Sequence, residues 1–272
     1  MNTQKYKEYS YFYYTFPMKT IFYYLPVLLL LNCTKEKSFA DHIRLHYGTQ
    51  EKLTFQNFNE GIDEAGSSII YVGKEISAVD VKYYLGMTDP PPPPPGSHME
   101  SIEAKDKEIL SAFFNTPFGR IKFSEKPITF DSLSEQNIKI TYKINDTIPK
   151  YAYNLETGTV KKYKAFPVFV KNISGKKLIL HEFKSLSLAV LNDQQKWQIL
   201  SNDNALVCGD SRWLYRYWEF NPNEIMVLSV NFLEGKDKGK FKICLSDYCT
   251  EVFLMNYDKS IVEKQRNRFE LK

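Results

Sequence analysis

The chain has 272 residues, and its 36 Lys and Arg side chains nearly balance its 32 Asp and Glu side chains, for a net charge of +4. This near balance, with no basic stripe and no acidic tail, excludes the electrostatic footprint of a nucleic-acid-binding protein. The length suffices for one or two domains with a sizeable core. The 19 Tyr and 19 Phe residues favour strands.

An apolar run of eleven residues, Ile21 to Leu31, follows Met18-Lys19 and is interrupted by Pro26. A membrane-spanning helix needs about 20 apolar residues. The run therefore predicts the apolar region of a secretory signal peptide. Because residues 1–17 are aromatic and polar, we expect translation to start at Met18, and residues 1–32 to be the signal peptide with its leading extension.

The stretch Leu30-Leu31-Asn32-Cys33 resembles the lipobox of bacterial lipoproteins, although Asn32 stands where a small residue is usual. The resemblance implies that the Cys33 thiol is diacylated, that the chain is cut before it, and that the new amino terminus is acylated. Several acyl chains make membrane anchoring effectively permanent, whereas one chain holds only marginally. We therefore expect an outer-membrane lipoprotein of the bacterial cell envelope, on its periplasmic or its surface side.

Residues 33–67 are predicted to form a polar tether with a short helix. His42 and His46 are four residues apart, which would place them on one helical face. A zinc site needs further ligands, and none is evident in the sequence, so we expect two solvated histidines and no metal.

Residues 68–125 predict a small α/β segment with a strand over Ser68–Val72, a helix over Ala78–Leu85 capped by Ser77, a second helix over Ser101–Phe114 and a strand over Arg120–Phe123. Six prolines, Pro90–Pro95, interrupt the segment as a stiff extended spacer. The following Gly96-Ser97-His98-Met99 spells the remnant of a cleaved expression tag. It lies downstream of the predicted signal peptide, so we interpret it as natural sequence.

Three stretches of this segment resemble the plug domain of TonB-dependent outer-membrane receptors. They are Val72-Gly73-Lys74-Glu75-Ile76, Glu100-Ser101-Ile102-Glu103 and Gly119-Arg120-Ile121-Lys122-Phe123. No large barrel follows, so the chain cannot itself be such a receptor. The resemblance implies at most a partnership with an outer-membrane transporter.

From residue 126 onward the pattern predicts an antiparallel β-sandwich, so the fold class is mainly β. Ile138, Ile140, Tyr142 and Ile144 alternate with polar residues, and further short apolar runs follow at roughly ten-residue spacing with turn clusters between them. The predicted strands are FPVFVKN, KLILHEF, LSLAVLN, KWQIL, WLYRYWEF, IMVLSVNF, KFKICL and TEVFLM.

The order of these strands and turns, from VKNISGKKLIL through NPNEIMVLSVNF to GKFKICLSD, resembles the immunoglobulin-like domain of uncharacterised Bacteroidetes-type lipoproteins. The resemblance covers about 125 residues within 126–272. It implies a fold and no activity.

Three cysteines follow Cys33, and export would place them where disulfides form. A hairpin turning at Ser246-Asp247 would pair Cys244 with Cys249 and direct the stripe Phe241, Ile243, Val252 and Leu254 toward the core. A bridge from Cys208 to one of these cysteines and a fully reduced state remain alternatives.

Two kinds of surface site are predicted. Asp131-Ser132-Leu133 and Asp146-Thr147-Ile148 match the loose sequon that Bacteroidetes-type envelopes use for O-glycans, with Ser132 and Thr147 as acceptors. The stretch Trp213-Leu214-Tyr215-Arg216-Tyr217-Trp218 is the predicted contact stretch, because Tyr, Trp and Arg are the residues that dominate interfaces. A core strand with one apolar face is the alternative interpretation.

Taken as a whole, the sequence predicts a lipid-anchored binding, adhesion or assembly module with a protein or glycan partner, no cofactor and no catalytic activity. One alternative is an accessory lipoprotein of an outer-membrane transporter. The other is an envelope hydrolase that uses Asp210, Ser211 and His181, since Gly209-Asp210-Ser211 spells the start of a GDS-type esterase block. The parallel α/β domain and late Asp-x-x-His that such an enzyme needs do not follow.

Overall fold

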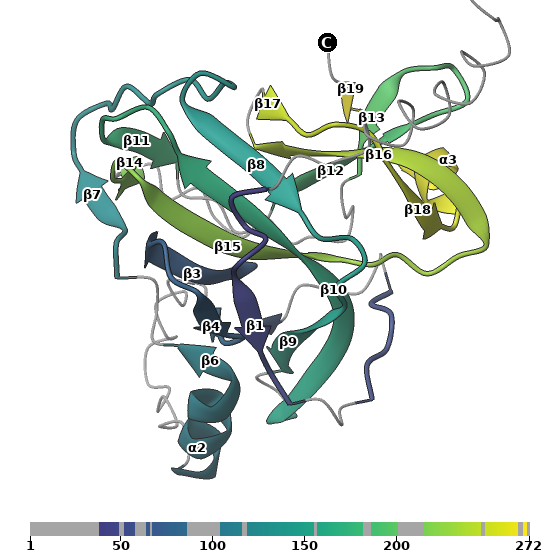
Figure 1. Ribbon diagram of the computed structural model, residues 1–272. Coiled ribbons are helices and arrows are strands. Elements are labelled where there is room, and N and C mark those ends of the chain that lie inside the picture. The colour runs from purple at the N-terminus through teal and green to yellow at the C-terminus, as the bar shows by residue number, and fades with distance from the viewer. Residues whose placement is uncertain are drawn as a thin grey trace, which may run out of the picture. The chain divides into compact units, whose positions relative to one another are not determined.

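The computed structural model shows a mainly β protein whose sheets are largely antiparallel, as the sequence predicts (Figure 1). It describes residues 38–48, 52–57, 64–65, 67–85, 104–115, 119–154, 157–181, 186–200, 215–245, 248–265 and 269–270. The described residues from Ala40 onward belong to one compact unit. The predicted signal peptide, Cys33 and the hexaproline with the following Gly96–Met99 lie outside the described residues. Within them, no helix has the length and apolar character needed to cross a bilayer.

The largest sheet is built around strand β10 (Thr159–Asn172) and strand β15 (Glu224–Asn231), which pair antiparallel from Ala165↔Asn231 to Lys171↔Ile225. The other edge of β10 has two partners in succession. The remaining strands are β2 (Glu64–Ala65), β9 (Ile148–Asn154), β8 (Ile138–Tyr142) and β3 (Ile69–Lys74), in the path β2-β9-β10-β15-β3 with β8 also on β10.

Pro167 lies at the point where the partner of β10 changes. Strand β9 pairs with β10 as far as Lys164, and β8 pairs with it from Val168 onward. A proline cannot donate a backbone hydrogen bond, so it is tolerated in a strand only where the ladder is interrupted or at an edge. The change of partner provides that interruption inside an otherwise central strand.

A second sheet faces the first, and their inner faces share one apolar core. This sheet follows the path β17-β16-β12-β13-β19, with β18 also paired to β16. Its strands are β12 (Ser187–Leu191), β13 (Trp197–Ile199), β16 (Asp237–Leu245), β17 (Tyr248–Cys249), β18 (Phe253–Tyr257) and β19 (Phe269–Glu270). The short helix α3 (Ser260–Lys264) contributes Val262 to the same core. The arrangement is a β-sandwich, as predicted for this part of the chain.

A three-stranded sheet extends the core. Its order is β11 (Leu178–His181), β14 (Tyr215–Phe220) and β7 (Lys122–Ser124). Leu178, Leu180, Trp218 and Phe220 are all at most 4 % exposed and belong to the core cluster. The predicted strands after residue 126 are thus all found, with shifted ends.

Both faces of the β10–β15 pair are buried, which explains their continuous apolar sequences. Phe166, Val168 and Val170 face the shared core, whereas Phe169 on the opposite face is also fully buried. Lys143 and the chain at Ile43 lie near this second face. The ammonium of Lys143 sits 5.3 Å from the Phe169 ring centroid and donates to the carbonyl of Ile43 at 3.0 Å.

The described part of the segment before the sandwich contains short strands and a ten-residue helix. Parallel pairs join β1 (Arg44–His46) to β4 (Ala78–Asp80) and β5 (Tyr83–Tyr84) to β6 (Phe114–Asn115). The predicted helix over Ala78–Leu85 is therefore wrong. Val79, Val81 and Tyr83 are buried in alternation, which is the period of a strand. The helix α2 (Ala104–Phe113) lies within the predicted Ser101–Phe114.

The sequence predicts a boundary between two segments near residue 126, but strands from before and after this residue pair with each other. Strand β3 is the edge partner of β15, and β7 pairs with β14. Arg120 also makes a bidentate ion pair with Glu224 at the start of β15, with nitrogen–oxygen distances of 2.7 and 2.9 Å. The described part of the predicted tether also contacts the sheet, since Tyr47 donates to the carbonyl of Thr147 and Thr54 donates its amide to the carbonyl of Lys162.

A disulfide joins Cys244 to Cys249, and these two residues face each other across β16 and β17. This confirms the predicted pairing and its register. Cys208, the predicted competitor, lies outside the described residues, as do the turn residues Ser246 and Asp247.

The return strand of this hairpin is where the register prediction is wrong. Ile243 still pairs with Thr250, but the next pair is Phe241 with Phe253, so the return chain contains one extra residue. This β-bulge reverses the faces of the strand that follows. Val252 and Leu254 are 47 % and 64 % exposed, whereas the larger Phe253, Met255 and Tyr257 enter the core.

Candidate functional site

The predicted contact stretch forms the middle strand of the three-stranded sheet. Trp218 is only 1 % exposed, its ring centroid lies 5.4 Å from that of Phe220, and its Nε1 donates to the carbonyl of His181 at 3.0 Å. The prediction of Trp218 as a contact residue is therefore wrong, because an alternating strand directs it into the core. Trp213 lies outside the described residues.

Arg216 and Tyr217 of this stretch are half-buried, and only the backbone of Tyr215 is described. The guanidinium carbon of Arg216 lies 5.7 Å from the ring centroid of Phe123 across the β14–β7 pair. This cation–π contact accounts for the orientation of Arg216. Of the side chains of this stretch that the structure describes, Arg216 and Tyr217 reach the surface and Trp218 does not.

His181, the histidine of the hydrolase alternative, is exposed and stacks on Phe130 with ring centroids 3.3 Å apart. Asp210 and Ser211, its proposed partners, lie outside the described residues. The stacking on Phe130 gives His181 a packing partner at the end of β11.

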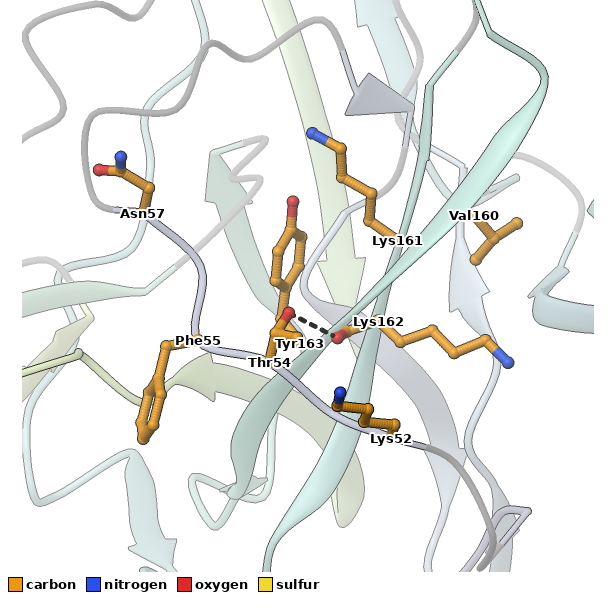
Figure 2. Close-up of a pocket in the computed structure, with 8 residues that line it drawn as sticks. All are labelled: Lys52, Thr54, Phe55, Asn57, Val160, Lys161, Lys162 and Tyr163. Atoms are coloured by element: carbon orange, nitrogen blue, oxygen red, sulfur yellow. Dashed lines mark hydrogen bonds between the residues drawn. The ribbon is translucent and has the colours of Figure 1, made fainter.

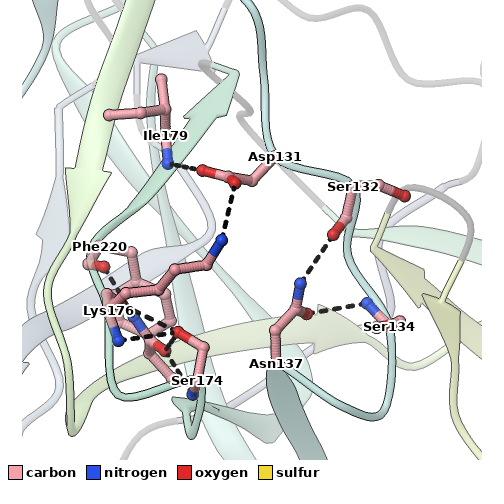
Figure 3. A network of polar contacts seen from close by, with 9 residues as sticks. Asp131, Ser132, Ser134, Asn137, Ser174, Lys176, Ile179 and Phe220 are labelled. Atoms are coloured by element: carbon pink, nitrogen blue, oxygen red, sulfur yellow. Dashed lines mark hydrogen bonds and ion pairs between the residues drawn. The ribbon is translucent and has the colours of Figure 1, made fainter.

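The two predicted O-glycan acceptors lie on exposed turns. Ser132 is exposed on a loop tied down by Asn137, whose Nδ2 donates to the Ser132 carbonyl and whose Oδ1 accepts from the Ser134 amide (Figure 3). Thr147 is exposed just before β9. The apolar third residues of both sequons, Leu133 and Ile148, are buried, so the folded chain offers the hydroxyls and not the whole sequon.

The neighbouring polar network in Figure 3 is structural. Asp131 accepts from the Ile179 amide at 2.7 Å, and Lys176 approaches its other oxygen at 3.8 Å. The buried Asn172 amide donates to the carbonyls of Lys176 and Phe220. These bonds satisfy backbone groups at the β10–β11 turn, where buried polar groups need partners.

The two histidines of the predicted tether lie on or beside a strand, not on a helix. His42 Nε2 lies 3.3 Å from a Glu75 oxygen, and His46 Nδ1 lies 3.8 Å from an Asp80 oxygen. Both pairs are well exposed. Among the described residues, no group of three or more His, Cys, Asp or Glu side chains could hold a metal ion.

One candidate place for a ligand is formed by a short segment, residues 52–57, that lies against the first half of β10. Thr54 donates its amide to the Lys162 carbonyl at 3.1 Å and accepts from the Lys164 amide at 2.7 Å. The Thr54 side chain also contacts the Lys162 carbonyl. These bonds fix the exposed ring of Phe55 beside the strand.

A hollow of about 590 Å³ opens between this segment and β10 (Figure 2). Its walls are Lys52, Thr54, Phe55, Asn57, Val160, Lys161, Lys162 and Tyr163. Lys161 and Tyr163 project from one side of β10 and Lys162 from the other, as strand alternation requires. All of the charged side chains in these walls are cationic.

A second hollow, of about 450 Å³, shares Phe55 with the first. Its walls are Phe55, Ile144, Thr147, Lys164, Phe232, Leu233, Lys238, Leu254, Met255 and Asn256. The Lys164 ammonium lies 4.4 Å from the Phe55 ring centroid, which is within the range of a cation–π contact. We call the two hollows together, with Phe55 between them, the Phe55 site.

The charged wall residues of the Phe55 site differ from those of a third hollow. Among the described residues, five lysines line the Phe55 site. The third hollow, of about 150 Å³, is lined by Asp193, Lys259 and Glu263 among others, and Lys259 pairs with Asp193 at 2.6 Å. The described charged walls are therefore cationic in the Phe55 site and of both signs in the third hollow.

Sequence reasoning missed this site because it missed strand β9 and the first half of β10. The alternation of Tyr151 with Tyr153 and the Thr157-Gly158 turn were local signals for that hairpin. The position of Thr54 beside Lys162, 108 residues away, has no local signal at all.

No protein-family model, no curated protein and no solved structure matches this chain. The site therefore has to be interpreted from its own chemistry.

Proposed function

We propose that this chain is a lipid-anchored, non-catalytic binding module of the bacterial cell envelope. The lipobox-like Leu30–Cys33 supports the anchor. The Cys244–Cys249 disulfide supports the compartment, because disulfides persist in oxidising environments such as the bacterial periplasm and the cell surface.

The observation that carries the binding role is the Phe55 site. Ligand sites are concave and combine apolar or aromatic walls with a few polar groups that fix orientation. The Phe55 site has this composition, with an exposed aromatic ring between two hollows and lysines in both.

The anchor is tested by changing Cys33 to Ser and fractionating cells, with Cys208→Ser as the matched control at another cysteine. Cys33→Ser should move the protein out of the detergent-soluble membrane fraction and remove the acyl mass from its N-terminal peptide. Cys208→Ser should change neither. A Cys33→Ser protein that stays in the membrane fraction with unchanged peptide mass would refute the lipoprotein proposal.

A further inference from the structure

Strand β18 is the edge partner of β16 in the second sheet (Figure 1). Lys240 lies opposite Leu254, and Lys238 lies opposite Asn256. Residues that lie directly opposite each other in a sheet project from the same face. All four of these side chains are exposed, whereas the intervening Phe241 is fully buried. We call the outer surface that carries these four side chains the β16–β18 face.

The two lysines of the β16–β18 face carry free positive charge. Among the described residues, the ammonium groups of Lys238 and Lys240 have no ion pair, hydrogen bond or ring partner. Strand alternation sends Asp237 to the other side of β16, where its carboxylate accepts a backbone amide from the chain after β18. Glu251, an exposed carboxylate before β18, lies near Tyr142. The two charges are therefore uncompensated and project from one face.

The next outward lysine along β16 shows where the free charge ends. The ammonium of Lys242 lies 4.6 Å from the ring centroid of Trp197, within the range of a cation–π contact. Lys242 is also half-buried and pairs with Ala189 of β12. The free lysines are thus confined to the edge of the sheet, beside Leu254.

Leu254 gives the β16–β18 face an exposed apolar side chain. It is 64 % exposed, and Val252, two residues earlier, is 47 % exposed. These are the two highest exposed fractions among the large apolar side chains that the structure describes. The β-bulge that turns Phe253 into the core leaves them outside. Because exposed apolar groups that gather in a patch mark a contact with a protein or a membrane, the neighbouring surface decides what Leu254 can do.

The second hollow of the Phe55 site continues this apolar surface. Leu254 is one of its walls, and Phe55, at 38 % exposure, is another. Six of its ten wall residues are apolar, namely Phe55, Ile144, Phe232, Leu233, Leu254 and Met255. A soluble polyanion would contact the lysines and leave these apolar groups in water. An anionic membrane surface would contact both, since basic and apolar side chains together favour the interface of such a membrane.

We infer that the β16–β18 face rests on an anionic phospholipid surface, with Lys238 and Lys240 toward the headgroups and Leu254 in the interfacial layer. Each lysine near such a surface strengthens the attraction roughly fivefold. The inference rests on the proposed function, because acyl chains on Cys33 would hold the module beside a membrane. The face would then determine which side of the module turns toward the bilayer.

The experiment measures amine labelling of the full chain, purified from the envelope in detergent and added to preformed vesicles. The vesicles are phosphatidylcholine alone or an equimolar mixture of phosphatidylcholine and phosphatidylglycerol, and bound protein is recovered by flotation. A membrane-impermeant acylating reagent labels exposed lysines, and peptide mass spectrometry measures each site. Labelling of Lys238 and Lys240 should be at least roughly fivefold lower on the anionic vesicles. Lys74 and Lys139, exposed lysines of the first sheet, should be labelled equally on both.

Variants separate the contributions of charge and apolar contact. Leu254→Ser should restore labelling of both lysines on the anionic vesicles, whereas Ile173→Ser, which removes another exposed aliphatic side chain, should not. Lys240→Gln should weaken the protection of Lys238 by roughly fivefold. The matched control, Lys139→Gln, makes the same charge change on the first sheet and should leave that protection unchanged. Raising the salt concentration should also restore labelling, because exposed charges are screened.

Several results would overturn the inference. These are equal labelling of Lys238 and Lys240 on both kinds of vesicle, equal protection of the control lysines, equal effects of Leu254→Ser and Ile173→Ser, or protein that floats with neither vesicle. Protection by soluble hexaglutamate as strong as that by anionic vesicles would assign the face to an acidic polypeptide instead. The mass of the N-terminal peptide in the same digest reports acylation of Cys33 separately, so failure of the face and failure of the lipid anchor are distinguishable.

Discussion

The two halves of strand β10 lie in different surroundings, although one backbone runs through both. From Ala165 to Val170 the side chains are buried on both faces, with the sandwich core on one of them. From Thr159 to Lys164 the strand leaves the sandwich and pairs with β9, and its lysines are half-buried at the surface. The buried half is apolar, and the outer half is where lysines accumulate.

This difference indicates how the fold separates stability from binding. The strand continues beyond the two-sided core, and its outer half carries Lys161, Lys162 and Lys164. Near the buried half, Arg120 forms an ion pair with Glu224. Substitutions should therefore change folding stability in one half and ligand affinity in the other.

The largest expected effect is on the buried half. Phe166 is fully buried, with its ring centroid 5.1 Å from that of Phe232 and 5.9 Å from that of Phe253. Phe166→Ala should lower the free energy of unfolding by about 3–5 kcal/mol, because it leaves a cavity in a close-packed core. Urea denaturation measures this. Phe123→Ala, at a 45 % exposed ring, is the control; comparable losses for both would contradict the two-sided core.

The next effect tests the paired charge. Burial raises the pKa of the Glu224 carboxyl, but hydrogen bonds from Arg120 and Asn221 outweigh it and hold the pKa below its usual value. Because the folded pKa lies below the unfolded one, the stabilisation is complete above about pH 4.5 and is lost as the pH falls through the folded pKa.

Glu224→Gln should therefore cost about 2 kcal/mol near neutral pH, and the difference from wild type should shrink in acid. Urea denaturation at several pH values measures it. Glu270→Gln removes the exposed partner of Lys196 and should cost little. A Glu224→Gln penalty that is constant down to pH 3 would show that the charge of Glu224 has no part in it.

The disulfide comes third. Replacing Cys244 and Cys249 together with Ala should cost about 2 kcal/mol, the low end for a native bridge, because the enclosed loop is short. Denaturation with and without reductant measures the loss, and reductant should have no effect on the double variant. Unreduced peptide mapping of envelope material should find Cys244 linked to Cys249; a link from either one to Cys208 would refute the pairing.

Much of the sandwich could be predicted from sequence because its signals are local. Runs such as FPVFVKN and IMVLSVNF are apolar throughout, and turn clusters separate them. The Cys244–Cys249 pairing also follows from alternation over a few residues. The predicted register after Thr250 was wrong because two alternating sets of residues could each have faced the core. The β-bulge near Val252 turns Phe253, Met255 and Tyr257 toward the core and leaves Val252 and Leu254 exposed.

The Phe55 site could not be predicted for a different reason. Its lysines lie in a stretch where alternation is weak, so the first half of β10 gave no clear strand signal. The contact that completes the site joins Thr54 to Lys162 across 108 residues, and nothing in either short sequence specifies the other. The predicted contact stretch Trp213–Trp218 shows the reverse case at one position, since Trp218, a residue type typical of interfaces, lies in the core instead.

The smallest expected effect is on the outer half of β10. Lys161→Gln keeps the length of the side chain and removes its charge, so the free energy of unfolding should change by no more than about 0.5 kcal/mol, as for other surface substitutions. The neighbouring Tyr163, only 4 % exposed, marks where the outer half is anchored, and Tyr163→Ala should cost several times more. Urea denaturation of both variants tests whether two positions only two residues apart on one strand differ in their effect on the free energy of unfolding. A loss above about 1.5 kcal/mol for Lys161→Gln would mean that its charge supports the fold, because surface positions rarely cost so much. The outer half would then no longer be the part of the strand that is free to serve a ligand.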